Sequence, residues 1–170
     1  MDLATAALIF ATNLTNKTWP ATWGPYDRQT MSEVVSGIVA ATSEPQMVEM
    51  LIKIARWESG GWRRDVITCA KNVGYTRGAF QVYPVNAQER KDVCSGDFTK
   101  QAAVALTHLK QSIGQCKRMG FSGSNLITVY THGQCHVAKD NLARMRWSDG
   151  KVIQTFLDEA IRPESGDTVL

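Results

Sequence analysis

The sequence predicts a mainly α-helical domain with one small β element, and two features of the chain lead to this class. Apolar residues recur at helical spacing in segments spread along the whole chain, whereas only residues 79–83 have the apolar and aromatic composition of a strand. The chain has 170 residues, 44% of them hydrophobic, which is enough to bury one core. We therefore expect a single domain over residues 1–170, with a core at 31–170 and residues 1–30 as a candidate N-terminal helical extension.

The first three predicted helices precede residue 60. The segment 1–10 has a short apolar stretch behind an acidic residue and lacks the positive segment that begins a secretory signal, so we expect an amphipathic or buried helix. A second helix is expected around residues 31–41. The third covers residues 46–58, where apolar residues recur at steps of three and four on one face: Met47, Met50, Leu51, Ile54 and Ala55.

Four more helices are expected after residue 100. The first has an apolar face made by Ala102, Leu106, Leu109 and Ile113. Two shorter helices are expected at residues 124–133 and 137–147. The last is strongly amphipathic and is ended by Pro163, and its apolar residues are Val152, Ile153, Phe156, Leu157, Ala160 and Ile161.

The strand predicted at residues 79–83 is bounded by Gly78 and Pro84. Alternation along a strand would place Gln81 on one face and Phe80 and Val82 on the other. The small β element would then present a polar amide to a cleft and two apolar side chains to the core.

Glu58 is the candidate catalytic residue, because it continues the apolar face of the helix at 46–58. A carboxyl group placed there points towards the core or a cleft wall. Desolvation disfavours its charged form and raises its pKa, which is the state that a general acid needs near neutral pH. The alternative is that Glu58 only ends the helix and faces solvent, as most glutamates do.

Two later segments add polar groups that suit a sugar ligand. Gly78 and Gln81 stand in a Gly-x-x-Gln pattern, and Tyr130 lies in an apolar helical segment from which its hydroxyl could reach a buried carboxyl. Together with Glu58 and Ser59, and in this order, they resemble the lysozyme-like lytic transglycosylases of the soluble lytic transglycosylase and goose-type lysozyme superfamily. The resemblance covers roughly residues 46–135.

The resemblance implies an α+β lysozyme-like fold, a bundle-like set of helices with a small β element beside the active-site cleft. It makes Glu58 the catalytic acid and base. It also implies substrate-binding or supporting roles for a set of neighbouring residues: Ser59, Gly78, Phe80, Gln81, Tyr83, Tyr130 and His132. The chain departs from the family pattern at Thr131 and His132, where the family usually has Asn and Ala.

The implied activity is cleavage of the β-1,4 bond between N-acetylmuramic acid and N-acetylglucosamine in peptidoglycan, with a 1,6-anhydromuramoyl product and no cofactor or metal. One alternative is a goose-type inverting muramidase, which needs a second carboxylate to activate water. The candidates for that second group are Asp65, Glu89, Asp92 and Asp97. Another alternative is a non-catalytic wall-binding or virion structural protein with the same fold.

The four cysteines, Cys69, Cys94, Cys116 and Cys135, allow three pairings if all are bridged. We favour Cys69 with Cys94 and Cys116 with Cys135, because each pair joins neighbouring segments. The alternative is four buried free thiols. A zinc site built from the last two cysteines with His132 and His136 is not favoured, because structural zinc usually needs closely spaced cysteine pairs.

Charge and hydropathy restrict the partners. The net charge is +3 and the basic residues are scattered, which suits an anionic wall polymer but predicts no nucleic-acid binding. No apolar run approaches the ~20 residues that span a bilayer. We therefore expect a monomer that binds peptidoglycan glycan strands in the periplasm or the extracellular wall. Without an evident signal peptide, it would arrive there by release at lysis, virion delivery or specialised secretion.

Overall fold

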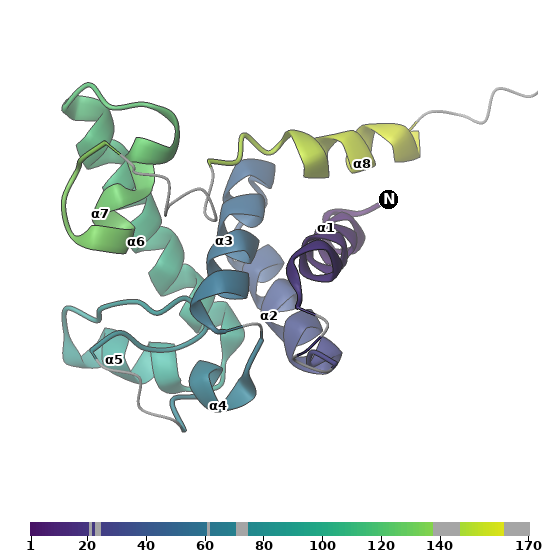
Figure 1. Ribbon diagram of the computed structural model, residues 1–170, viewed down its shortest axis with the longest axis horizontal. Helices are drawn as coiled ribbons and strands as arrows, with labels where there is room; N and C mark the ends of the chain where they lie inside the picture. The colour runs from purple at the N-terminus through teal and green to yellow at the C-terminus, as the bar shows by residue number, and fades with distance from the viewer. Residues whose placement is uncertain (21, 23–24, 61, 71–74, 138–146, 162–170) are drawn as a thin grey trace, which may run out of the picture.

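The computed structural model describes residues 1–20, 22, 25–60, 62–70, 75–137 and 147–161. Its elements run α1 (Leu3–Thr18), α2 (Arg28–Ala41), α3 (Pro45–Glu58), α4 (Arg64–Ile67), α5 (Ala87–Cys94), α6 (Phe98–Arg118), the 3-10 helix η2 (Gly123–Ile127), α7 (Thr128–His132) and α8 (Lys151–Ile161). The mainly helical class predicted from the sequence is confirmed (Figure 1).

Side chains just outside the helices fix where several of them begin. The carboxylate of Asp2 accepts a hydrogen bond from the backbone N–H of Thr5 at 2.8 Å, and Asp27 does the same for Thr30 at 2.8 Å. Asp97 accepts from two N–H groups at the start of α6. These bonds satisfy N–H groups that have no partner within the helix.

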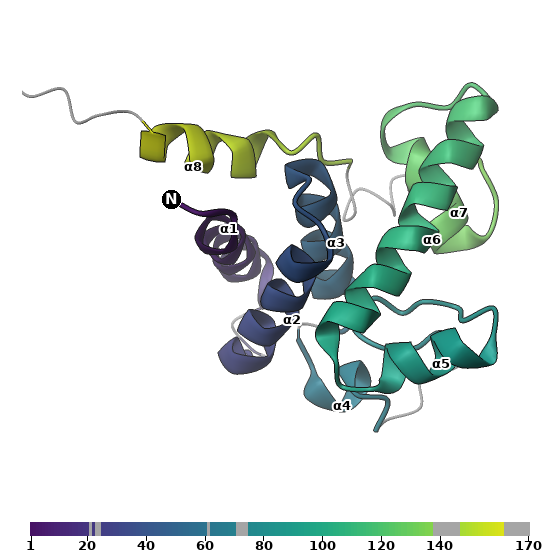
Figure 2. The same ribbon diagram turned by 180° about the vertical axis from the view of Figure 1, so that it is seen from behind.

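Helix α3 is the centre of the fold. It packs against α1, α2, α6 and α8, and both views show it between the α1–α2 pair and the long helix α6 (Figures 1 and 2). All five residues of the predicted apolar face of α3 are at most 5% exposed. Its neighbours contribute further buried residues, including Ala6, Phe10, Val34, Ile38, Ala105, Leu109 and Ile153. Burial of α3 on several sides holds its C-terminal end, and therefore Glu58, in a defined place.

Helices α2 and α6 approach each other closely at Gly37. A Cβ atom at that position would lie 2.6 Å from the backbone carbon of Phe98. Contacts that short do not occur between real side chains, so the packing of α6 on α2 requires glycine here.

The strand predicted at residues 79–83 is not confirmed. Among the described residues only an isolated antiparallel bridge between Arg77 and Val82 has β pairing, and residues 78–81 form the turn between them. The backbone cannot stay extended, because Gly78 has φ 74° and Gln81 has φ 47°. Phe80 and Val82 are buried as expected, at 1% and 2% exposed.

The other helix predictions have mixed outcomes. The helix expected at 124–133 is present as η2 followed by α7, whereas most of the one expected at 137–147, and Pro163 after the last helix, lie outside the described residues. The short helices α4 and α5 had not been predicted. The buried face of α6 also includes polar Gln101 and Ser112, which an apolar pattern cannot identify.

The predicted disulfide pairing is confirmed. Cys69 is bonded to Cys94 and Cys116 to Cys135. The first bond joins the segment after α4 to the end of α5, and the second joins α6 to the segment after α7. In the part of the chain that the structure describes, no helix is both long and apolar enough to cross a bilayer.

Candidate functional site

Glu58 is the last residue of α3, and its side chain is half-buried. Burial raises the pKa of its carboxyl group above the usual value. Within the described part of the chain no hydrogen bond or ion pair satisfies this carboxyl group. The group is therefore desolvated without being paired, and this makes the protonated form easier to keep near neutral pH.

Ser59 holds the chain immediately after Glu58. Its hydroxyl donates to the carbonyl of Ala55 at 2.6 Å and accepts from the backbone N–H of Trp62 at 2.9 Å. The indole N–H of Trp62 in turn donates to Thr15 Oγ1 of α1 at 2.9 Å. Ser59 and Trp62 are both fully buried, so they fix the end of α3 from inside.

The turn with the Gly-x-x-Gln pattern is closed by its own side chains. The Gln81 amide nitrogen donates to the carbonyl of Gly78 at 2.9 Å, and its amide oxygen accepts from Thr76 Oγ1 at 2.9 Å. No other residue fits at position 78, because a Cβ atom there would lie 2.4 Å from the carbonyl oxygen of Val93. Gln81 thus has a clear role in holding the turn, in addition to the sugar contact predicted for it.

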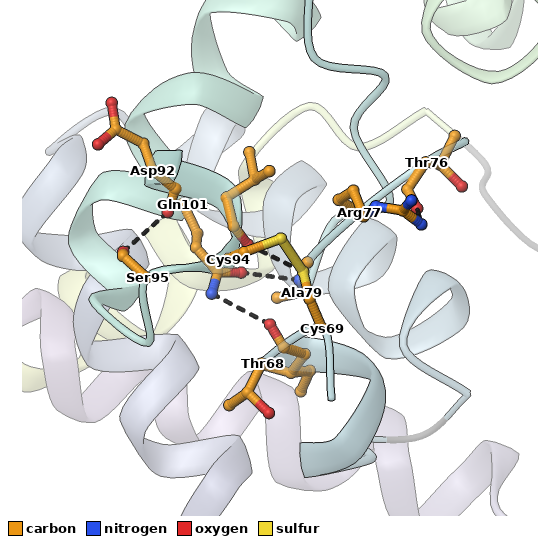
Figure 3. The surroundings of a disulfide bond; sticks show 12 residues. Thr68, Cys69, Thr76, Arg77, Ala79, Asp92, Cys94, Ser95 and Gln101 are labelled. Atoms are coloured by element: carbon orange, nitrogen blue, oxygen red, sulfur yellow. Dashed lines mark hydrogen bonds between the residues drawn. A yellow bond between two sulfur atoms is a disulfide. The ribbon is translucent and has the colours of Figure 1, made fainter. Parts of the chain in front are cut away.

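Gln101 of α6 fastens this turn to the rest of the domain (Figure 3). It is 1% exposed, its amide oxygen accepts from the backbone N–H of Ala79 at 2.8 Å, and its amide nitrogen donates to the carbonyl of Ile67 at 3.1 Å. The Cys69–Cys94 bond lies beside these two hydrogen bonds (Figure 3). The buried amide therefore joins α6 to the turn and to α4, and the disulfide joins the segment after α4 to the end of α5.

Tyr130 of α7 reaches the same place from a third direction. Its hydroxyl donates to the carbonyl of Phe80 at 2.9 Å. Burial raises the pKa of Tyr130 well above its usual value, and the negative charge of Glu58 raises it further. The hydroxyl donates to the turn, whereas the sequence had suggested that it holds the carboxyl group.

The predicted site residues therefore divide into two groups. Glu58, the turn at 78–81 and Tyr130 come together from α3, the segment before α5 and α7. Tyr83 is 62% exposed, and the exposed His132 bonds Thr131 Oγ1 through its Nδ1 at 2.7 Å. No contact among the described residues links Tyr83 or His132 to Glu58.

Sequence reasoning missed three buried polar residues on α3 and α6. Gln101 belongs to no sequence motif. Its structural role is recognisable only from the backbone groups that its amide bonds. Arg56 is 1% exposed, with its guanidinium 5.1 Å from the ring centre of Trp19 and 5.0 Å from that of Trp57. Glu49 is 1% exposed. The one available signal for Glu49 was its position between apolar residues, with Met47 and Val48 before it and Met50, Leu51 and Ile52 after it.

A pocket of about 770 Å³ adjoins the turn that follows Glu58. Trp19, Tyr26 and Trp62 are among its described lining residues, together with the ion pair of Arg63 and Asp65. Its size suits a small ligand. Neither Glu58 nor Tyr130 is among the residues that line it, so we assign it no catalytic role.

Potential metal ligands are dispersed in this part of the molecule. The described residues contain no group of three or more His, Cys, Asp or Glu side chains that could hold an ion. Cys116 and Cys135, considered as zinc ligands with His132 and His136, form a disulfide.

Comparison of the chain with protein-family models, with curated proteins and with solved structures gives no match. The features of the chain that bear on function are therefore the surroundings of Glu58 and the sequence pattern around it.

Proposed function

We propose that the chain is a peptidoglycan-cleaving enzyme of the lytic transglycosylase type, with Glu58 as its acid and base. The observation that carries the proposal is the unpaired, half-buried Glu58 carboxyl group with its raised pKa. Tyr130, whose pKa the Glu58 charge raises, and the turn that Tyr130 contacts follow Glu58 in the order typical of that family.

The first step is proton donation. Protonated Glu58 gives its proton to the oxygen of the glycosidic bond between N-acetylmuramic acid and N-acetylglucosamine. The bond from C1 of the muramoyl sugar to that oxygen breaks, and positive charge develops on the muramoyl ring. The departing sugar leaves with a free 4-hydroxyl group.

The second step restores the acid. The Glu58 carboxylate removes the proton from the 6-hydroxyl of the muramoyl sugar while that oxygen bonds to C1. The product is a 1,6-anhydromuramoyl end, no water is consumed, and Glu58 is protonated again. Because the Tyr130 hydroxyl donates to Phe80, it does not occupy the carboxyl oxygens that must receive this proton.

The state of the other acids favours this route over hydrolysis by an inverting mechanism. Asp65 pairs with Arg63, and Glu89 accepts from His108 and from the backbone of Val85. Asp92 accepts from Gln88, and Asp97 caps α6. Each makes a local contact of its own, so we prefer the route in which Glu58 alone acts as acid and base.

The proposal includes a lysozyme-like arrangement in which the turn at 78–81 serves as the cleft element. It also places the enzyme at the cell wall, in the periplasm or outside the cell. Two disulfides support an oxidising compartment, because such bonds persist mainly outside the cytosol.

Digestion of purified peptidoglycan followed by mass spectrometry tests the proposal. We expect fragments with 1,6-anhydromuramoyl ends, and none from a Glu58→Gln variant. Reducing ends would indicate a hydrolase instead. Binding to walls without any cleavage would indicate a non-catalytic wall-binding protein and would reject the enzymatic proposal.

A further inference from the structure

We propose that His132 and His136 form a two-histidine site for Zn²⁺ or a similar divalent transition metal. His132 ends α7 and His136 follows it in the next segment, and their imidazole rings form a T-shaped contact with centres 5.0 Å apart. This inference does not depend on the glycan-cleaving function proposed above.

The spacing of the rings matches the geometry of a shared metal. With a Zn–N bond of about 2.0–2.1 Å and a tetrahedral angle, two imidazole centres bound to one zinc lie about 5 Å apart. The observed 5.0 Å agrees with this distance.

Both rings also have Nδ1 beside an oxygen atom, an arrangement that suits metal-binding histidines. Nδ1 of His136 is 3.1 Å from the carbonyl of Gln134, which can only accept, so that nitrogen carries the hydrogen. Nδ1 of His132 is 2.7 Å from Thr131 Oγ1. With a metal on Nε2 of His132, this Nδ1 donates to Thr131, whose own hydrogen goes to the carbonyl of Ile127 at 3.3 Å.

These hydrogen bonds leave the two Nε2 atoms as the available ligands. Neither Nε2 bonds to a described residue, and His132 is exposed to solvent. A neutral imidazole with Nδ1 held by an oxygen is the form that binds zinc through Nε2.

The turn that carries the two histidines is held on several sides. Gly133 has φ 77° and ends α7. The backbone N–H of His136 donates to Thr128 Oγ1 at 3.1 Å, and the adjoining Cys135 is bonded to Cys116 of α6. A pair of ligands on a fixed turn loses little conformational freedom when it binds an ion.

Two protein ligands leave two positions of a tetrahedral zinc open to water or to an oxygen of a bound molecule. The site is therefore an exchangeable one, unlike a structural zinc site with four protein ligands. Because α7 carries both Tyr130 and His132, a bound ion would lie at the border of the candidate catalytic region.

Isothermal titration of Zn²⁺ into untagged, metal-free protein with intact disulfides tests the inference. We expect one zinc per chain in the wild type. His132→Ala and His136→Ala should each weaken binding by about tenfold or more, since loss of even a supporting partner typically costs 10–100-fold. His108→Ala is the matched control, because His108 is occupied by Glu89 at 3.0 Å and should leave zinc binding unchanged.

Nuclear magnetic resonance of the histidine rings gives a second measurement that does not depend on activity. Zinc should shift the ring signals of His132 and His136 and leave those of His108 in place. Wild-type zinc affinity in the double variant, or an effect of only one of the two histidines, would overturn the two-histidine site. Circular dichroism of each variant checks that the fold is retained.

Discussion

An acidic side chain lies towards each end of α3, and the two have different surroundings. Near its N-terminal end, Glu49 accepts a hydrogen bond from the backbone N–H of Ile153 at 2.7 Å and another from the hydroxyl of Ser148. Lys53, on the same helix, bonds Ser148 as well. At the C-terminal end, Glu58 is half-buried and has no hydrogen bond to a described residue.

The presence or absence of hydrogen-bond partners distinguishes a structural acid from a candidate reactive one. Glu49 caps the N-terminus of α8, where the helix dipole favours a negative charge, so its burial is compensated. Glu58 has no hydrogen-bond partner among the described residues, and burial raises the pKa of its carboxyl group. Burial of a carboxyl group alone is therefore a poor guide to catalysis, and the absence of partners is the feature to look for.

The largest expected effect is on activity and tests the Glu58 end. Glu58→Gln should lower wall lysis by about 10²–10⁴-fold, since the amide keeps the size of the side chain but cannot deliver a proton. Glu49→Gln is the matched control and should retain lysis, because its amide oxygen can still accept from Ile153. A turbidity assay on purified walls measures both. Lysis by Glu58→Gln within tenfold of wild type would move the catalytic role elsewhere.

The next effect concerns the Cys69–Cys94 loop, which carries the turn at 78–81. Replacing Cys69 and Cys94 with alanine opens a loop of 25 residues and should cost on the order of 3 kcal/mol of stability. Lysis should fall as well, because Gly78 and Gln81 lie within that loop. Thermal melting and turbidity measure the two effects.

The double alanine variant of Cys116 and Cys135 opens a loop of 19 residues and should lose a similar amount of stability. At a temperature where both variants remain folded, we expect the Cys69 and Cys94 variant to be the less active one. Equal lysis by the two would show that the turn at 78–81 does not need its disulfide.

At the Glu49 end the expected effect is on stability alone. Glu49→Ala leaves the backbone N–H of Ile153 and the Ser148 hydroxyl without their acceptor, which should cost about 1–3 kcal/mol. Glu159→Ala, an exposed acid on α8, should change stability by less than about 0.5 kcal/mol. Urea unfolding compares the two. Equal losses would mean that the buried cap contributes nothing.

The smallest effect is a pH dependence that distinguishes the two ends. Because the pKa of Glu58 is raised in the folded state, wild-type stability relative to Glu58→Gln is highest below the usual carboxyl value of 4.5. It falls as the pH rises through the higher folded value. The glutamine variant should therefore melt at a higher temperature than wild type at neutral pH, with the difference vanishing in acid. A less stable variant at neutral pH would indicate a stabilising partner for the Glu58 carboxylate.

The sequence was sufficient for the elements that depend on local apolar patterns. It located α3 and α8, and the Cys69–Cys94 and Cys116–Cys135 pairs followed from proximity along the chain. The end of α3 and the position of Glu58 on its apolar face also followed, because helical spacing alone determines which side a residue occupies.

The remaining features depend on contacts between distant segments. The segment at 79–83 has strand composition, but Gly78 and Gln81 adopt positive φ values and the Gln81 amide closes a turn. The buried Gln101 amide bonds two backbone groups that lie 22 and 34 residues away, those of Ala79 and Ile67. The partner of Tyr130 was misassigned for the same reason, since a carbonyl group leaves no mark in the sequence.

The bonds at the two ends of α3 also differ in how far along the chain their partners lie, and this has a consequence for folding. The turn after Glu58 is anchored by the contact of Trp62 with Thr15, 47 residues apart. Glu49 bonds groups 99 and 104 residues away, near the end of the chain. Closure of such long loops is slow, so we expect the Glu58 end to become ordered first and α8 to dock last.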